Sequence, residues 1–391
     1  MPPAPIPLPA PAPTAPRQPP TPRRQASSLT LTFVGDINLG TLTIPAGVPP
    51  DNGRGLFDAA RPSLTGDLVI GNFEGVLGDS GTTYKCGKQG RLVTLAHTAP
   101  PPPEPAKKRP PRAVKPGTKP APPRLCYAFL TPTALAPRLV EGGLTHLNLA
   151  NNHANDFGPD ARANTERILD SLDLVTYGPI GRIAIDTVRR GDSVTTVGLV
   201  GFTTYPYAYD LLDIARSAAV VDSVRPLVDL LVVTFHGGAE GSGALHVPEA
   251  AESLGREPRG DLRAWSHAVI EAGADAVVGH GPHVLRGIEF HRGKPVAYSL
   301  GNFLTYRGFN LEGPLGMTGV LQLEWSPDLA FRRGRFVPMA QRPGKGPAPD
   351  TSLAALKLIR ALSVEDFGSS APRFDDDGGF ELLAPRTEPP Y

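Results

Sequence analysis

Five apolar segments of this chain each end in side chains that could bind a metal ion or move a proton. The segments cover residues 29–35, 67–72, 146–151, 230–236 and 275–280, and each pattern is typical of a buried strand. In open α/β sheets, ligands bind where the strands end at their carboxyl edge. The side chains beside or just after these five ends are the candidates for chemistry: Asp36, Asn38, Asn72, Glu74, Asn152, His153, His236, His280 and His283.

These candidates combine carboxylate, amide and imidazole groups, which are the ligands that hard and borderline divalent cations bind. Each motif alone is weak, because a Gly-Asp pair is a common turn and a histidine after a strand is often a buried or capping residue. The recurrence of all five after strands favours one shared site. The number of groups suffices for two ions that share a bridging carboxylate.

The elements that position these groups alternate along the chain. Helices are expected at 131–143, 159–172 and 261–273, and the strand–helix alternation predicts a mostly parallel sheet covered on both faces. Segments 182–202 and 286–304 are typical of hairpins. Further strands are expected at 318–325 and 331–337, a helix near 351–362, and an irregular tail at 374–391.

Composition narrows the class of protein. The chain has 391 residues, with 39 basic against 38 acidic side chains, so nothing supports binding of nucleic acid or an anionic membrane by overall charge. No apolar run is long enough for a transmembrane helix. With only two cysteines, a cysteine-based zinc site is excluded.

Proline concentrates in two segments of the sequence. Residues 1–28 hold 11 prolines and are expected to form an extended tail; they lack the pattern of a signal peptide. Residues 100–123 hold another 11 and are basic. This second segment is either a solvated surface loop or a contact strip for an acidic polymer.

Cys86 and Cys126 flank the second proline-rich segment. They are either a disulfide that pins the base of this insertion or two buried free cysteines. A bridge would stabilise the fold by roughly 4 kcal/mol in the chain-entropy model, less any strain. It would also indicate that the protein works outside the reducing cytoplasm.

Several motifs together resemble the bacterial CapA family of capsule and poly-γ-glutamate synthesis proteins, which is similar to calcineurin-like metallophosphatases. The matching segments are FVGDINLG (33–40), GNFEGVL (71–77), LNLANNHANDFG (147–158), FHGGAE (235–240) and GADAVVGHGPHVLRGIEFHRGKPVAYSLGNF (273–303). The resemblance implies an α/β calcineurin-like metallophosphoesterase fold with layered sheets flanked by helices. It would occupy 29–340, with the insertion at about 87–125, a tail at 1–28, and an extension at 341–391 that packs on the domain or is partly irregular.

The resemblance also implies roles for individual residues. Two divalent ions, of Mn, Fe, Zn or Mg, would share Glu74 as the bridging carboxylate, and His153 would act as general acid or stabilise developing charge. Two departures stand out: Asn38 replaces the histidine of the usual Asp-x-His motif, and His283 comes one residue later than in Gly-His-x-His. The implied metal ligands are Asp36, Glu74, Asn152, His236, His280 and His283.

Three residues have two interpretations each, and four residues are expected to contact the substrate. Asp156 either orients His153 or caps the helix near Pro159. Glu240 either reaches the metal ions or binds a backbone turn, and Asn302 either donates into the site or forms a turn. Substrate contacts are expected from Asn38, Asn72, Glu240 and Asn302. Five histidines match no ligand motif and are expected on the surface or in the core: His97, His146, His246, His267 and His291.

Two functions from different classes fit this sequence. One is a metal-dependent hydrolase of phosphoester or γ-amide bonds in capsule or poly-γ-glutamate biosynthesis or export. The other is a non-catalytic, metal-dependent binder or carrier of an anionic polymer such as poly-γ-glutamate. Both imply an extracytoplasmic location, in the cell envelope or periplasm, and membrane partners of capsule synthesis, although no signal peptide is visible in the sequence.

Overall fold

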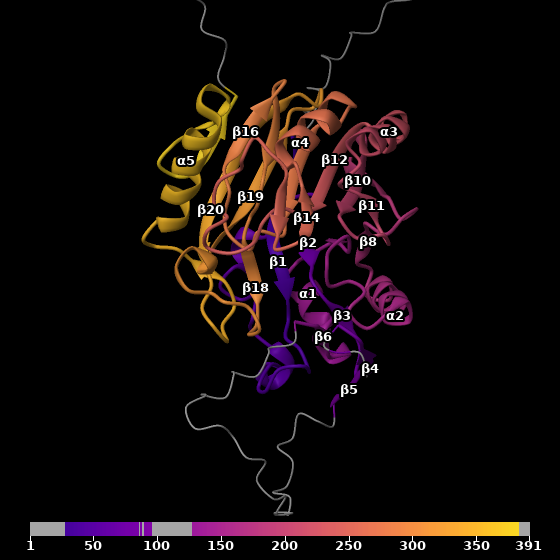
Figure 1. The fold of residues 1–391 in the computed structure, drawn as a ribbon. Helices are drawn as coiled ribbons and strands as arrows, with labels where there is room; N and C mark the ends of the chain where they lie inside the picture. Colours follow the sequence, from indigo (N-terminus) through magenta and orange to yellow (C-terminus); the bar gives the residue numbers. More distant parts are fainter. Residues whose placement is uncertain (1–27, 86, 88–89, 96–126, 383–391) are drawn as a thin grey trace, which may run out of the picture.

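Two large β-sheets lie face to face and carry helices on their outer sides (Figure 1). The computed structural model describes residues 28–85, 87, 90–95 and 127–382. One apolar cluster fills the space between the sheets, with Leu31 and Phe33 from one sheet and Val232 and Val278 from the other. The α/β fold with layered sheets and flanking helices is therefore as expected.

The first sheet mixes parallel and antiparallel strands. β1 (Leu29–Asn38), β2 (Leu68–Phe73), β7 (His146–Asn148) and β8 (Val175–Tyr177) run parallel, and β19 (Met317–Trp325) pairs antiparallel with β1. Beyond β19 follow β20 (Phe331–Ala340), β23 (Gly379–Glu381) and β22 (Arg373–Phe374). β18 (Asn302–Thr305) pairs with the end of β1, and β21 (Ala348–Pro349) pairs with β20.

The second sheet has a parallel centre and a hairpin at each side. β10 (Ser193–Thr203), β12 (Leu230–His236), β15 (Ala276–His280) and β17 (Lys294–Ala297) run parallel. β9 (Ala184–Arg190) and β16 (Ile288–His291) close the two predicted hairpins, and β11 (Tyr209–Asp210) pairs with β10. Three small two-stranded sheets are β3 (Val76–Leu77) with β6 (Leu130–Thr131), β4 (Ser80–Thr83) with β5 (Arg91–Thr94), and β13 (Glu252–Leu254) with β14 (Glu257–Gly260).

Helices cover the outer faces because their apolar sides pack there. α1 (Pro137–Glu141) and α2 (Pro159–Asp170) bury leucines against the first sheet, and α3 (Ile214–Val224) and α4 (Leu262–Glu271) pack on the second. The Asp261 carboxylate caps α4 by accepting from Ala264 N at 3.0 Å. α5 (Ala354–Phe367), at the left of Figure 1, contacts β16, β19 and β20 and so joins both sheets. Short 3-10 turns cover Pro50–Gly53, Arg61–Ser63, Thr133–Leu135, Arg225–Leu227, Gly313–Gly316 and Gly368–Ser370.

Three expectations about the elements were wrong in part. The five apolar segments divide between two sheets: 29–35, 67–72 and 146–151 lie in the first sheet, and 230–236 and 275–280 lie in the second. Segment 131–143 forms a 3-10 turn and then α1, because Pro137 has no N–H and begins a new helix. The tail expected to be irregular forms β22 and β23, whose Phe374 and Phe380 enter the core between the sheets.

Other expectations fall outside the described residues. Cys86, Cys126, nearly all of the proline-rich tail and the basic segment 100–123 are among them, so the disulfide and the polymer contact strip stay predictions. The division into tail, domain and extension also stays a prediction. Within 28–85, 87, 90–95 and 127–382, no helix combines the length and apolar character needed to cross a membrane.

Candidate metal centre

The carboxyl ends of strands from both sheets meet at one place. Asp36 is near the end of β1 and Glu74 directly follows β2, whereas His236 and His280 end β12 and β15 of the other sheet. Asn72 connects the two sheets: its Nδ2 donates to Asp36 Oδ1 at 2.8 Å and lies 3.2 Å from His236 Nδ1. The predicted convergence at strand ends therefore occurs across a junction between sheets.

Asp36, Glu74 and His283 form the tightest group of possible ligands. One ligand atom from each lies within 4.8 Å of the others. His283 Nδ1 is 2.9 Å from Asp36 Oδ2, and its Nε2 is 3.7 Å from Glu74 Oε1. Two further imidazoles extend the group, because His280 Nδ1 is 3.6 Å from Asp36 Oδ1 and His236 Nε2 is 3.9 Å from Glu74 Oε1.

Several polar atoms of this group are buried and have no hydrogen-bond partner in the described part of the chain. They are both carboxylate oxygens of Glu74, His236 Nε2 and His280 Nδ1. Asn152 Oδ1, in the residue before His153, is unpaired in the same way. Leaving such an atom unpaired costs roughly 1–3 kcal/mol. Carboxylate oxygens, an amide oxygen and imidazole nitrogens are also the donors that divalent ions take up. The residues therefore fit a metal ion, which would supply the missing partner for each atom.

Burial and the neighbouring charges strongly shift the pKa values of the groups in this site. Burial raises the pKa of Glu74 well above its usual range. Burial also opposes ionisation of Asp36, but His280 and His283 outweigh it and lower the pKa of Asp36 below its usual range. Although burial alone would lower the pKa of His283, the charges of Glu74 and Asp36 raise it to about 10. A cation bound by His283 would compete with that proton, because a ligating imidazole is neutral.

His153 and Asp156 stand beside the metal ligands as a pair. His153 Nδ1 lies 2.6 Å from Asp156 Oδ2, and Nε2 on the other side of the ring is 3.7 Å from Glu74 Oε1. Burial lowers the pKa of His153, and the Asp156 carboxylate opposes that shift. Asp156 does not cap α2, whose N-cap is Gly158 without a side-chain hydrogen bond. Its side chain instead lies where it can hold the imidazole.

Two predicted site residues hold the backbone around the centre. Asn38 Nδ2 donates to Glu74 O at 2.7 Å, and Asn38 Oδ1 accepts from Gly40 N at 3.1 Å. Asn302 Nδ2 donates to His283 O and to Leu315 O, each at 3.1 Å. His283 has a φ of 60°, a conformation that costs energy for a side chain with Cβ, so this support is needed there.

Glu240 and Asn152 lie near the centre with fewer direct contacts. Glu240 Oε1 accepts from Arg259 Nη2 at 2.5 Å, and its Oε2 is 4.0 Å from His283 Nε2. Glu240 therefore belongs to an ion pair at the edge of the site. Asn152 contributes the unpaired oxygen described above. The position of Asn152 is compatible with its predicted role as a metal ligand, and that of Glu240 with its predicted substrate contact. Both roles stay predictions.

Four residues of the site had not been predicted. Asn151 Nδ2 donates to Phe73 O at 2.8 Å, and its Oδ1 accepts from His153 N at 3.1 Å. Asn148 donates to Asn72 Oδ1 at 3.0 Å. Phe129 packs on the His153 ring with centroids 4.2 Å apart, and Lys85 reaches Asp156. The Asn151 position adjoins a predicted motif and could have been found, whereas Lys85 and Phe129 approach only through the fold.

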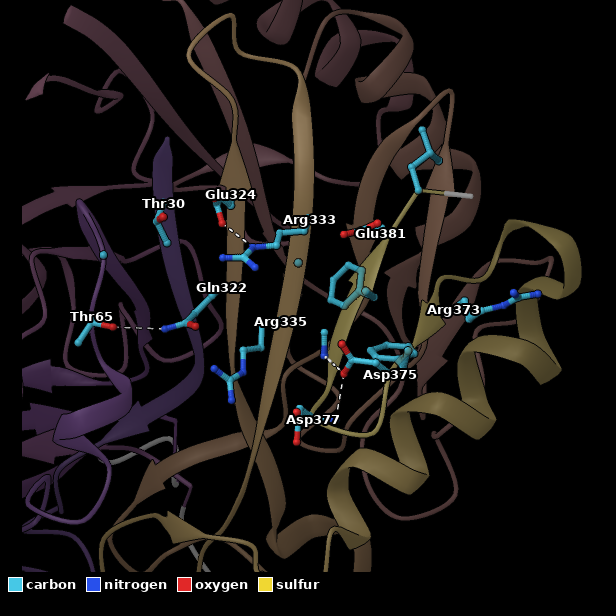
Figure 2. A pocket seen from close by; sticks show the side chains of 16 residues that line it. Thr30, Thr65, Gln322, Glu324, Arg333, Arg335, Arg373, Asp375, Asp377 and Glu381 are labelled. Atoms are coloured by element: carbon cyan, nitrogen blue, oxygen red, sulfur yellow. Dashed lines mark hydrogen bonds and ion pairs between the residues drawn. The ribbon is translucent and has the colours of Figure 1, made fainter. Parts of the chain in front are cut away.

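A separate groove of about 980 Å³ lies on the first sheet beside β19, β20 and β23 (Figure 2). Glu324 pairs there with Arg333, and Asp375 accepts from the backbone of its own turn. None of the predicted site residues lines it. The groove therefore gives no competing candidate for the chemistry.

Comparisons with solved structures give distant likenesses. A putative 5′-nucleotidase from Staphylococcus aureus aligns with a TM-score of 0.42 and 13% identity, over 86% of this chain and 58% of that one. A 5′-nucleotidase precursor from Thermus thermophilus aligns with a TM-score of 0.41 and 14% identity, over 87% and 59% of the two chains.

Comparisons of sequence give closer relatives. The capsule biosynthesis protein CapA of Bacillus anthracis is 26% identical over 310 residues, which are 74% of this chain and 63% of that protein. The PGA biosynthesis protein CapA of Bacillus subtilis is 30% identical over 185 residues, or 44% and 45% of the two chains. The chain thus spans less than two thirds of either relative. The family model for the bacterial capsule synthesis protein PGA_cap matches residues 113–307. With these relatives, that match places the chain in the CapA family of bacterial capsule synthesis proteins.

Proposed function

We propose that this chain is a metal-dependent hydrolase that acts in capsule or poly-γ-glutamate biosynthesis or export, on a phosphoester or γ-amide bond. One observation carries the proposal: buried oxygens and nitrogens from both sheets converge without hydrogen-bond partners among the described residues. A structural role would not require this, because hydrophobic residues would fill the space at lower cost. Names of the relatives, which refer to capsule and PGA biosynthesis, support the biological setting.

The proposed centre holds two divalent ions, of Mn, Fe, Zn or Mg. When bound, such ions would supply Lewis-acid activation of water and of the substrate oxygen. Asp36, Glu74 and His283 are the group best placed to hold one ion, since their ligand atoms lie within 4.8 Å of one another. The full proposed ligand set is Asp36, Glu74, Asn152, His236, His280 and His283.

In this proposal His153 moves the proton that the leaving group needs. Asp156 accepts from Nδ1, so Nε2 is the nitrogen that faces the centre, 3.7 Å from Glu74 Oε1. His153 can carry a proton on Nε2 and deliver it to the departing oxygen or nitrogen. Asp156 stabilises the charged imidazole before that transfer. Phe129 packs against the ring and limits its rotation.

The second candidate is a metal-dependent binder or carrier of an anionic polymer that hydrolyses nothing. Asn38 favours this candidate, because it occupies the motif position of a histidine ligand and uses both ends of its amide on backbone groups. It is therefore not available to complete a second ion site. In both candidates we place the protein in the cell envelope, together with membrane proteins of capsule synthesis.

Metal analysis followed by turnover assays tests the proposal. We expect the purified chain to retain divalent metal and to hydrolyse at least one member of a panel of phosphomonoesters, phosphodiesters and γ-linked oligoglutamates. Asp36→Ala should abolish both metal binding and turnover. Tight binding of oligoglutamate without hydrolysis of any panel member would favour the carrier. Failure to bind any divalent ion would exclude both candidates.

A further inference from the structure

A lysine at the rim of the site, Lys85, reaches into the buried His153–Asp156 pair. Its Nζ lies 2.6 Å from Asp156 Oδ1, 3.2 Å from His153 Nδ1 and 3.3 Å from the carbonyl oxygen of Asn152. The Lys85 side chain is 38% exposed, whereas the Asp156 side chain is 1% exposed. This contact therefore differs from an ordinary surface ion pair, because one partner is inside the protein.

The contacts of Asp156 divide between its two oxygens. Oδ2 accepts from His153 Nδ1 at 2.6 Å and from Phe129 N at 2.8 Å, while Oδ1 accepts from Lys85 Nζ. The backbone oxygen of Asp156 accepts from Thr83 Oγ1 at 2.7 Å. Lys85 thus supplies the hydrogen bond that the structure gives to Oδ1. Without it, this buried oxygen would lack a partner among the described residues, and only the two hydrogen bonds to Oδ2 would hold the carboxylate.

The orientation of the carboxylate decides which nitrogen of His153 faces the centre. With Oδ2 directed at Nδ1, the hydrogen on Nδ1 is held there and Nε2 points to the Glu74 side. Lys85 cannot donate to a protonated Nδ1, since both groups are donors. The two donors instead share the carboxylate, one on each oxygen.

We propose that Lys85 is a positioning residue that acts through Asp156 to hold the His153 imidazole with Nδ1–H toward Asp156 and Nε2 toward the reacting groups. The catalytic consequence rests on the proposed hydrolase function, but the orientation itself does not. Lys85 immediately precedes Cys86, at the start of the proline-rich insertion, and Phe129 follows that insertion. Residues from both of its flanks therefore meet on the Asp156 carboxylate.

The activity test uses Lys85→Met, which keeps much of the side-chain length and removes the charge and the donors. The matched control is Lys294→Met, since Lys294 makes an ion pair of the same 2.6 Å with Asp275 and is 33% exposed. Two esters should be compared, one with a nitrophenolate and one with an alkoxide leaving group. The alkoxide depends on general-acid help, which contributes ~10²–10⁴-fold.

We expect Lys85→Met to lower kcat for the alkyl ester by about 10–100-fold, which is a fraction of the full general-acid effect. The kcat for the nitrophenyl ester should fall much less, because its leaving group needs little help from an acid. Metal content should be unchanged, Lys85→Arg should recover most of the rate, and Lys294→Met should match the parent. An equal loss on both esters, or a rise in KM with kcat unchanged, would overturn the proposal in favour of a general structural or substrate-binding role.

A second measurement is independent of activity. In protein with 15N-labelled histidine, the ring nitrogen shifts of His153, assigned by their loss in His153→Asn, report which nitrogen carries hydrogen. We expect Nδ1–H in the parent and in Lys85→Arg, and a mixture of tautomers in Lys85→Met. An unchanged tautomer in Lys85→Met would refute the positioning role. If the parent hydrolyses neither the phosphoesters nor the γ-linked oligoglutamates, the hydrolase function fails while this measurement still decides the role of Lys85.

Discussion

Each side of the candidate site has a buried carboxylate beside a buried imidazole, but the two carboxylates differ in their hydrogen bonds. On the metal side, both oxygens of Glu74, His236 Nε2 and His280 Nδ1 lack hydrogen-bond partners among the described residues. On the acid side, His153, Asp156 and Lys85 bond to one another. Since the Glu74 and Asp156 side chains are both buried, the difference indicates that the first side is built for a partner from outside the chain and the second is complete without one.

This difference separates what each side contributes. The metal side should gain stability and order when an ion binds, because its unpaired atoms then find a partner. The acid side should keep its geometry with or without an ion. Substitutions on the metal side should therefore lower both metal content and reaction rate, whereas substitutions on the acid side should lower the rate alone.

The largest effect is expected for Asp36→Ala. It removes a proposed ligand and the partner of His283, which lies 2.9 Å away. Loss of contacts that merely orient ligands already costs about 10–100-fold in metal affinity, so we expect a loss greater than ~100-fold and no measurable turnover. Elemental analysis after gel filtration and a rate assay with added metal measure both. Asp328→Ala, at an exposed carboxylate, is the control. Retention of full metal content in Asp36→Ala would contradict the assigned ligand set.

On the acid side, His153→Ala should separate rate from metal content. The side chain contributes no atom to the tight Asp36–Glu74–His283 group, so the metal stoichiometry should stay that of the parent. The rate should fall by ~10²–10⁴-fold, the usual contribution of a general acid. Metal loss in this variant would make His153 a ligand, and an unchanged rate would remove it from the mechanism.

Glu74→Gln tests, through the free energy of unfolding, what the unpaired carboxylate oxygens of Glu74 cost the metal-free protein. In the parent, a divalent ion at a hundred times its dissociation constant should stabilise the fold by ~2.7 kcal/mol. We expect that gain to be much smaller in Glu74→Gln, because the substitution removes the proposed bridging carboxylate. The metal-free variant should be at least as stable as the metal-free parent, since burial disfavours the Glu74 charge. Thermal unfolding with Mn²⁺ and with chelator gives both comparisons, and an equal Mn²⁺ gain in the two proteins would contradict them.

Features of the site that depend on neighbouring residues in the sequence or on the rule for strand ends could be predicted, whereas other contacts between residues far apart in the chain could not. The segment 230–236 was predicted with its observed ends because an apolar run followed by His236 is a local signal. The meeting of Asp36, Glu74 and His280 followed from the rule for strand ends. The assignment of strands to two sheets did not, because an apolar run looks the same in either sheet.

The acid side was harder to foresee. Lys85 and Phe129 are separated by the whole proline-rich insertion, and nothing in their local sequence indicates that both bond to Asp156. The commitment of Asn38 to backbone groups was equally invisible, since its motif position suggests a side chain directed at substrate. These contacts depend on tertiary packing, which periodicity and motifs do not encode.

The smallest expected effect concerns His146 on β7, a buried histidine outside the site. Its Nε2 also lacks a hydrogen bond among the described residues, although Asp186 lies 3.4 Å away. Burial lowers its pKa from 6.5 to about 4, so between these values the unfolded chain binds a proton that the folded chain does not. Stability should therefore fall as the pH decreases through this window, by ~2 kcal/mol from about pH 7 to about pH 5.

His146→Gln should remove that part of the pH dependence, measured by urea unfolding at several pH values with chelator present. The control is His246→Gln, at an exposed histidine paired with Asp366. Because no group of potential ligands surrounds His146 within the described part of the chain, added Mn²⁺ should stabilise His146→Gln as much as the parent. An unpaired nitrogen alone would then not be a mark of a metal ligand; convergence with other donors would be. If His146→Gln instead weakened the stabilisation by Mn²⁺, His146 would also contribute to metal binding.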